Sequence, residues 1–263
     1  MIKEQLELCK SLKVSPDYFL FGLYSGYFCD AKKLKPFSNA IEEVKKLLPK
    51  SVNILEIGGG NGMVGQYIKS CLSKLKVKAN LTIIDTWKEG LDCNLDSTTK
   101  KVFGDNKKLP FKNASFDIVC ARSVTHYEKN LKDINKVLGE VKRVLKSGGF
   151  YIDQAITFES ISERKIFKSI QKVLNRDMTL NGSSQYELIL RKYFYKIKQR
   201  KAFSCLQPQS DLQKRYPIND GKIQKIMKIV EKNYKSKNMP HFHMKKKHFS
   251  WDVPFTLFIG SKE

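Results

Sequence analysis

The stretch Leu55-Glu56-Ile57-Gly58-Gly59-Gly60-Asn61-Gly62 decides the fold of this chain of 263 residues. The apolar residues from Val52 to Ile57 predict a short strand, and residues 62–75 carry apolar side chains at helical spacing. Glycines between a strand and a helix let the backbone turn tightly and approach a ligand closely. The N-terminus of the following helix favours negatively charged groups. The stretch therefore predicts a ligand-binding loop.

Strand and helix patterns alternate on both sides of this loop. Strands are predicted at residues 52–57, 81–84, 102–103 and 118–121 and from residue 150, and helices at 38–48, 62–75 and 131–145. We expect Ser38 or Asn39 to cap the helix at 38–48, and Ser147-Gly148-Gly149 to end the helix at 131–145. This alternation predicts an α/β fold in which helices cover both faces of a parallel sheet, and such sheets bind ligands outside the carboxyl ends of their strands.

The flanking segments have weaker patterns. Helices are predicted at residues 3–13, 161–175, 184–193 and 221–235, and strands at 194–203 and 253–260. We expect a single domain with three parts. Residues 1–48 form an N-terminal helical lid, residues 49–158 form the ligand-binding core, and residues 159–263 complete the sheet and contain a basic helical insertion at about 204–250.

Composition excludes several protein classes. Hydrophobic residues make up 41% of the chain, which is enough for a sizeable core, yet no apolar run approaches the roughly 18 residues of a membrane span. The acidic start Met1-Ile2-Lys3-Glu4 argues against a signal or transit peptide. The six cysteines form no Cys-x-x-Cys pair, which argues against a disulfide scaffold or a zinc site. We therefore expect a cytoplasmic protein.

The charge balance is strongly basic. Lys and Arg number 49 against 26 Asp and Glu, which gives a net charge of +23 and an isoelectric point near 9.7. The segment from Arg191 to Ser250 contains 17 basic residues and three acidic ones. Such an excess suits RNA or an anionic membrane surface. Because only seven of the basic residues are arginine and the chain holds 14 asparagines, AT-rich codon drift remains an equal alternative.

The glycines fit two classes of cofactor site. The pattern Gly60-x-Gly62-x-x-Gly65 matches a dinucleotide-binding loop, but its first glycine lies later after the strand than that fingerprint requires. The pattern Glu56-x-Gly58-x-Gly60-x-Gly62 places an acid at the end of the strand. This second pattern resembles the first motif of class I S-adenosylmethionine-dependent methyltransferases.

The resemblance continues in order over residues 50–155. Asp85 ends the second strand, Gly104-Asp105-Asn106 follows the third, and the segments Leu109-Pro110-Phe111 and Ser115-Phe116-Asp117-Ile118-Val119 are typical of the UbiE and type 11 group. Residues 141–150 resemble that group's RVLKPGG segment, with Ser147 in place of proline. Gly59 stands where the family often has Cys or Thr. The resemblance implies a Rossmann-like sheet of seven strands, mostly parallel, with the last strand antiparallel.

The resemblance also implies the cofactor S-adenosylmethionine, with S-adenosylhomocysteine as its product. Asp85 would bind the ribose, and Asp105 and the backbone of Asn106 would lie at the adenine. Glu56 either reaches the methionine amine or accepts hydrogen bonds from nearby amides, and Trp87 either stacks on the adenine or packs in the fold. The expected cofactor-binding residues are Glu56, Gly58, Gly59, Gly60, Gly62, Asp85, Thr86, Trp87, Gly104, Asp105, Asn106, Arg122, Tyr24 and Tyr27.

Four residues after the fourth and fifth strands are candidates for substrate contact: His126, Tyr127, Asp153 and Glu159. Methyl transfer needs a base only if the acceptor must lose a proton, and His126 is the candidate general base because its unperturbed pKa lies near 6.5. Pocket lining is the alternative role for His126. No metal site is expected, since His241, His243 and His248 stand among lysines that indicate a solvated loop.

Three functions follow from these residues. The family resemblance favours a methyltransferase that acts on a small molecule such as a metabolite, lipid or quinone. The basic segment 191–250, with its interleaved aromatics, makes RNA the alternative substrate. A non-catalytic scaffold is the third hypothesis, although the glycine loop and Asp85 are intact. No obligate protein partner is inferred.

Overall fold

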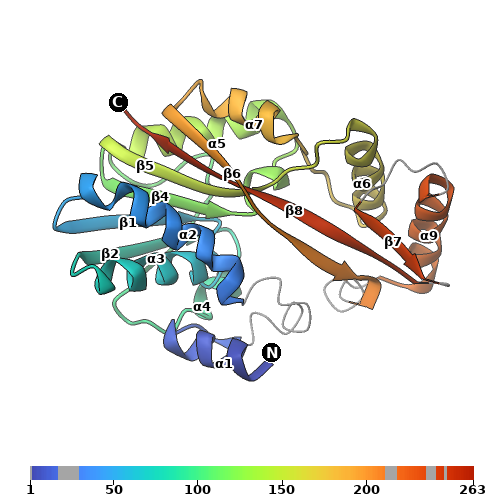
Figure 1. Cartoon of the computed structure of the whole chain (residues 1–263), viewed down its shortest axis with the longest axis horizontal. Coiled ribbons are helices and arrows are strands. Elements are labelled where there is room, and N and C mark those ends of the chain that lie inside the picture. The colour runs from blue at the N-terminus through green and yellow to red at the C-terminus, as the bar shows by residue number, and fades with distance from the viewer. Residues whose placement is uncertain (1, 17–29, 211–217, 235–240, 246–247) are drawn as a thin grey trace.

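The computed structural model describes residues 2–16, 30–210, 218–234, 241–245 and 248–263, and its centre is one mixed sheet (Figure 1). Its strand order is β3-β2-β1-β4-β5-β8-β6, with β7 paired to β8. The first five strands run parallel to one another. They are β1 (Ser51–Ile57), β2 (Lys78–Asp85), β3 (Lys100–Phe103), β4 (Phe116–Arg122) and β5 (Leu145–Ile156). The predicted α/β fold is confirmed.

Helices cover both faces of this sheet, because each carries an apolar face that must be buried. On one face, α2 (Ala31–Val44) and α3 (Met63–Lys74) pack on β1 and β2 through a cluster that includes Phe37 and Ile68. On the other face, α5 (Leu131–Val144) and α7 (Ser183–Leu190) pack through a second cluster that includes Val137 and Tyr186. The shorter helices are α1 (Ile2–Ser11), η2 (Lys45–Leu47), α4 (Lys88–Asp92) and η3 (Thr125–Tyr127).

The C-terminal strands depart from the seven-strand expectation, because the described part of the chain forms an eight-stranded sheet. Strands β6 (Tyr195–Pro208) and β8 (His248–Ser261) form a long antiparallel pair, and β8 also pairs antiparallel with β5. Strand β8 continues past the point where β5 ends at Ile156, and β7 (Phe242–Lys245) pairs with this extension. The antiparallel last strand is therefore confirmed, and the extra strand fills the edge that β5 leaves open.

This extension carries a third apolar cluster with its own helices. Helices α6 (Ile161–Val173) and α9 (Asp220–Tyr234) lie together beyond the carboxyl end of β5 (Figure 1). They pack on β7 and β8 through a cluster rich in aromatic side chains, among them Phe167, Phe242 and Trp251. Trp251 is 1% exposed. We call residues 157–181, 203–210, 218–234, 241–245 and 248–255 the projecting part.

Three local predictions are wrong. Helix α2 begins at Ala31, capped by the Asp30 side chain, and it runs through Pro36, so Ser38 lies inside the helix. Helix α5 ends at Val144, since Leu145 already pairs with Phe116, and Gly148 and Gly149 lie within β5. The segment read as a solvated histidine loop forms β7 and the start of β8.

Within the described residues, the helices are too short or too polar to cross a membrane.

Candidate functional site

The glycine loop leaves β1 with three residues in a left-handed backbone conformation: φ is +53° at Gly58, +51° at Gly60 and +78° at Gly62. A side chain at Gly58 would place its Cβ 2.8 Å from Cγ2 of Val124, and one at Gly62 would place it 2.8 Å from Nδ2 of Asn94. Both the conformation and the space therefore require glycine at these two positions. The loop lies at the carboxyl end of β1, as the sequence predicts.

Asp85 ends the neighbouring strand β2 and faces this loop. Its Oδ2 accepts the Gly60 amide proton at 2.8 Å, and its Oδ1 accepts the Trp87 amide proton at 2.9 Å. Because a carboxylate offers about four acceptor positions, two remain for a ligand. This arrangement suits a pair of adjacent hydroxyl groups.

Asp85 opens onto a cleft of about 610 Å³ at the carboxyl edge of the sheet. Asn106 lies in the wall of this cleft. Its buried Oδ1 atom has no hydrogen-bond partner among the described residues. An acceptor of this kind suits an amino group on a planar base. The lining residues are Gly58, Asp85, Thr86, Trp87, Asp105, Asn106, Lys107, Val124, Tyr127, Glu128, Lys129 and Asp133.

The cleft lies inside the segment that matches a known family. Residues 55–153 match the family model described as a methyltransferase domain. This segment carries a methyltransferase domain, similar to the class I enzymes of the UbiE and type 11 group. The first two motifs of this methyltransferase domain are therefore the glycine loop and Asp85, and S-adenosylmethionine is the cofactor that the cleft residues fit.

Individual relatives match the methyltransferase domain over part of their length. The ubiquinone/menaquinone biosynthesis C-methyltransferase UbiE of Brucella anthropi is 31% identical over 106 residues, which are 37% of this chain and 38% of that protein. UbiE of Rickettsia bellii is 27% identical over 130 residues, 46% of this chain and 50% of that protein. The chain thus spans half or less of the length of these two relatives.

Solved structures extend the likeness in fold. The YcgJ protein from Bacillus subtilis superposes with a TM-score of 0.71 at 15% identity, covering 89% of this chain and 99% of that one. At this identity the likeness concerns the fold alone.

Six of the fourteen sequence-predicted cofactor residues line the cleft: Gly58, Asp85, Thr86, Trp87, Asp105 and Asn106. Trp87 is 45% exposed, so its ring is available for a ligand to stack on. Gly59, Gly60, Gly62, Gly104 and Arg122 shape the strand ends and loops behind the cleft. For example, Gly104 donates its amide proton to the Asp85 carbonyl at 3.0 Å. Tyr24 and Tyr27 lie outside the described residues.

Glu56 stands behind the glycine loop and is 4% exposed. Its Oε2 accepts the Gly65 amide proton at 2.7 Å, at the start of α3. Burial raises the Glu56 pKa to about 8, although the Gly65 hydrogen bond and the charge of Arg122 oppose this rise. The described contacts thus favour the amide-partner role over a direct contact with the cofactor amine, which stays a prediction.

The η3 turn carries both His126 and Tyr127, but only Tyr127 is among the described residues that line the cleft. Tyr127 lines the cleft and carries the Arg176 guanidinium 4.7 Å above its ring. His126 is 4% exposed, packs against Tyr127 with ring centroids 4.2 Å apart, and is absent from the described cleft lining. Its role as a base stays a prediction, and its position suits pocket support.

Asp153 and Glu159 have partners within the fold. Tyr186 donates its hydroxyl proton to Asp153 Oδ2 at 2.6 Å, and burial raises the Asp153 pKa to about 7. Glu159 Oε1 accepts the Ser183 amide proton at 2.9 Å, at the start of α7. Neither is among the described residues that line the cleft, so substrate contact by these acids stays a prediction.

Sequence reasoning missed the opposite wall of the cleft. Lys107 pairs with Glu128 at 3.2 Å and with Asp105 at 3.4 Å, and Lys129 and Asp133 stand nearby in the lining. These residues lie in turns and at the start of α5, where charged side chains usually only face solvent. The tertiary fold brings these residues together, so no spacing in the local sequence predicts that they line the cleft.

The histidines pair with separate acids rather than with one another. His241 Nδ1 lies 2.7 Å from Glu163, and His243 Nε2 lies 2.9 Å from Asp252. No group of three or more His, Cys, Asp or Glu side chains in the described ranges is arranged to hold a metal ion.

Proposed function

We propose that this protein transfers a methyl group from S-adenosylmethionine to a small molecule. One observation carries the proposal: within the matched methyltransferase segment, the glycine loop, Asp85 and the pair Asp105 and Asn106 meet in a single cleft. In this proposal Asp85 holds the ribose hydroxyls and Asn106 faces the adenine amino group. The methionine part lies along the glycine loop.

When bound, the cofactor would supply a methyl group on a positively charged sulfur: the acceptor would bond to the methyl carbon as the carbon–sulfur bond breaks, and S-adenosylhomocysteine would leave. The protein's contribution is alignment, since holding donor and acceptor in line supplies much of the rate. Asp85 and the glycine loop would hold the methyl donor. Tyr127 of the η3 turn lines the part of the cleft through which an acceptor would approach the methyl group. A base is required only for an acceptor that must lose a proton.

The small-molecule acceptor is supported by the relatives, whose names place them in ubiquinone and menaquinone biosynthesis. A quinone precursor is therefore the first acceptor class to test.

An RNA acceptor is the second candidate, and the charge of residues 191–250 favours it. The aromatic residues of that segment weigh against it. Phe194, Phe242 and Phe249 are at most 5% exposed, so they cannot stack on bases, whereas Tyr195 on β6 and Tyr234 on α9 are 53% and 44% exposed. Lys198 and Arg200 of β6 are also paired with Glu43. The described surface therefore lacks a row of stacking platforms.

The test uses methyl-labelled S-adenosylmethionine and a cell extract that is afterwards separated into RNA, protein and small molecules. We expect label in the small-molecule fraction, and we expect the Asp85→Ala variant to abolish it. Label confined to RNA would replace the small-molecule proposal with the second candidate. No labelled product, together with cofactor binding by the intact protein, would favour the scaffold hypothesis.

A further inference from the structure

Asn94 is a buried residue that fits against the glycine loop from behind. It is 2% exposed, its Nδ2 donates to the Asn61 carbonyl at 2.8 Å, and its Oδ1 accepts the Asp96 amide proton at 3.1 Å. The same Nδ2 occupies the space that a side chain at Gly62 would need. Asn94 therefore holds the loop at two consecutive residues, Asn61 and Gly62.

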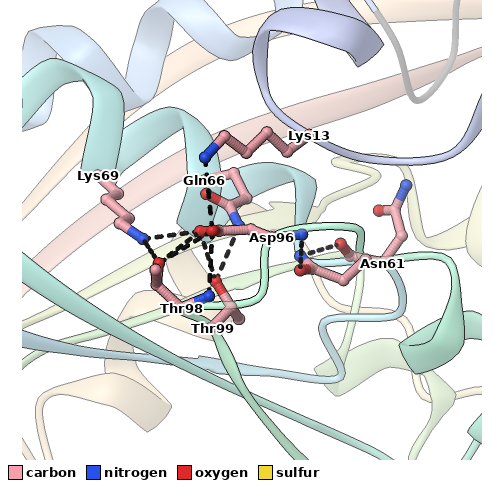
Figure 2. Close-up of polar contacts among 8 residues, drawn as sticks. Lys13, Asn61, Gln66, Lys69, Asp96, Thr98 and Thr99 are labelled. Atoms are coloured by element: carbon pink, nitrogen blue, oxygen red, sulfur yellow. Dashed lines mark hydrogen bonds and ion pairs between the residues drawn. The ribbon is translucent and has the colours of Figure 1, made fainter.

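Asp96 fixes the segment that carries Asn94. Figure 2 shows side chains from α3 and from the same segment converging on its carboxylate. Oδ2 accepts from Lys69 at 2.7 Å, from Gln66 at 3.1 Å and from Thr99 at 3.0 Å. Burial opposes the charge, but the hydrogen bonds from Lys69, Gln66 and Thr98 keep the pKa of Asp96 below its usual range. The charged carboxylate thus fastens the segment to α3, the helix that follows the glycine loop.

The same segment also binds the N-terminal part of the chain. Val14 forms a β-bridge with Asn94, the Ser15 amide donates to the Cys93 carbonyl at 2.7 Å, and the Leu95 amide donates to the Lys13 carbonyl at 2.8 Å. Lys13 also lies 3.7 Å from Asp96. Residues 93–96 therefore lie between the N-terminal segment and the glycine loop and contact both.

We propose that residues 93–99 form a clamp that keeps the glycine loop in its binding conformation, with Asn94 and Asp96 as positioning residues for the cofactor. This inference rests on the proposed function. Three glycines at positive φ make the loop easy to deform, because glycine loses more conformational freedom on ordering than any other residue. The Gly60 amide must also stay on Asp85, which lines the cleft. The clamp supplies the restraint that the loop's own sequence lacks.

The test measures S-adenosylhomocysteine binding to the intact protein by calorimetry and by the emission of Trp87, which lines the cleft. We expect Asn94→Ala to weaken binding about tenfold and Asp96→Asn to weaken it about threefold. Asn94→Ser, which keeps a hydrogen-bonding group, should fall between wild type and Asn94→Ala. Thermal unfolding is recorded for every variant.

Asn135→Ala is the matched control. Asn135 also makes two side-chain hydrogen bonds, donating to the Leu131 carbonyl and accepting from Tyr193, but it lies on α5 and does not contact the loop. It should lower stability as Asn94→Ala does while leaving binding unchanged. If Asn94→Ala and Asn94→Ser bind within twofold of wild type, the clamp inference is overturned. If the wild-type protein does not bind S-adenosylhomocysteine, the proposed function is contradicted, and the clamp inference, which rests on it, is contradicted too.

Discussion

The parallel half of the molecule, which is strands β1 to β5 with the helices that cover them, differs from the projecting part in how its charged side chains are paired. In the parallel half, lysines are paired with carboxylates, as in Lys69 with Asp96, Lys107 with Glu128 and Lys146 with Asp117. In the projecting part, Lys165, Lys228 and Lys232 line a groove of about 400 Å³ between α6 and α9, and the described residues place no acid against them.

This difference shows that the overall charge of +23 is not evidence about the cleft. The polar groups that fit a cofactor lie in the parallel half, where the cleft residue Lys107 is paired with Glu128 and Asp105. The projecting part has its own aromatic core and a basic surface, and it can differ in stability from the rest. The predictions below separate the two regions, beginning with the largest effect.

Trp251→Ala should destabilise the projecting part by about 3–5 kcal/mol, because it empties a fully buried site. Trp251 lies within 6 Å of the rings of Phe249, Phe242 and Phe167, with centroids 5.5, 5.6 and 5.9 Å away. Urea unfolding measures the change in the free energy of unfolding. Trp251→Phe should cost much less, since Nε1 makes no hydrogen bond to the described residues.

The same variant tests whether the two regions are independent. If they are, Trp251→Ala should keep its affinity for S-adenosylhomocysteine under native conditions and unfold in two steps. A parallel loss of affinity would mean that the projecting part supports the cleft.

Titration of Asp153 should change the free energy of unfolding of the parallel half by about 2–4 kcal/mol. Its folded pKa of about 7 lies above the ordinary value of 3.8, so the folded protein binds this proton more tightly than the unfolded chain. Its contribution to stability is therefore complete below about pH 4 and is lost as the pH rises to about 7.

Asp153→Asn keeps an oxygen that can accept from Tyr186 but cannot carry the charge. It should reduce the pH dependence between about pH 4 and 7, leaving the part that comes from Glu56, and be more stable than wild type at pH 8. Denaturation curves at several pH values measure both effects, and an unchanged slope would rule out Asp153 as the titrating group.

Asp85→Ala should weaken S-adenosylhomocysteine binding about a hundredfold, which is about 2.7 kcal/mol. Hydrogen bonds to a charged group contribute roughly 1.5–3 kcal/mol each, and the variant also frees the Gly60 amide. Asp85→Asn keeps an acceptor for Gly60 and should lose less affinity. Unfolding of both variants should stay close to wild type, so an equal loss of stability and affinity would argue for a merely structural role.

The sequence predicted the parallel half well because local and global signals agree there. The run from Val52 to Ile57 is apolar and buried, and glycines stand where φ is positive, so periodicity and turn chemistry indicate the same structure. It failed at α2, where Pro36 suggests a break, but the Asp30 cap and the buried Phe37 extend the helix across it. It also failed at Phe242, whose burial depends in part on the ring of Phe167 in α6, far earlier in the chain.

The site shows the same limit. Gly58 and Asp85 could be found because their own conformations and spacing carry the signal. Asn94 could not, since its importance comes from the Asn61 carbonyl and from the space at Gly62, which only the folded chain brings together. Asp153 looked available at a strand end, but Tyr186 from a later helix covers it.

Charge reversal in the basic groove should have the smallest effect. The double variant Lys165→Glu and Lys228→Glu changes two exposed side chains that have no acid partner among the described residues, so stability should shift by less than about 0.5 kcal/mol. Cofactor affinity should stay at the wild-type value because the groove is separate from the cleft. Methyl transfer to the small-molecule fraction should also be unchanged, since that proposal gives the groove no part in the reaction. Loss of transfer with intact cofactor binding would instead assign the groove to substrate recognition, and the two regions would then share one function.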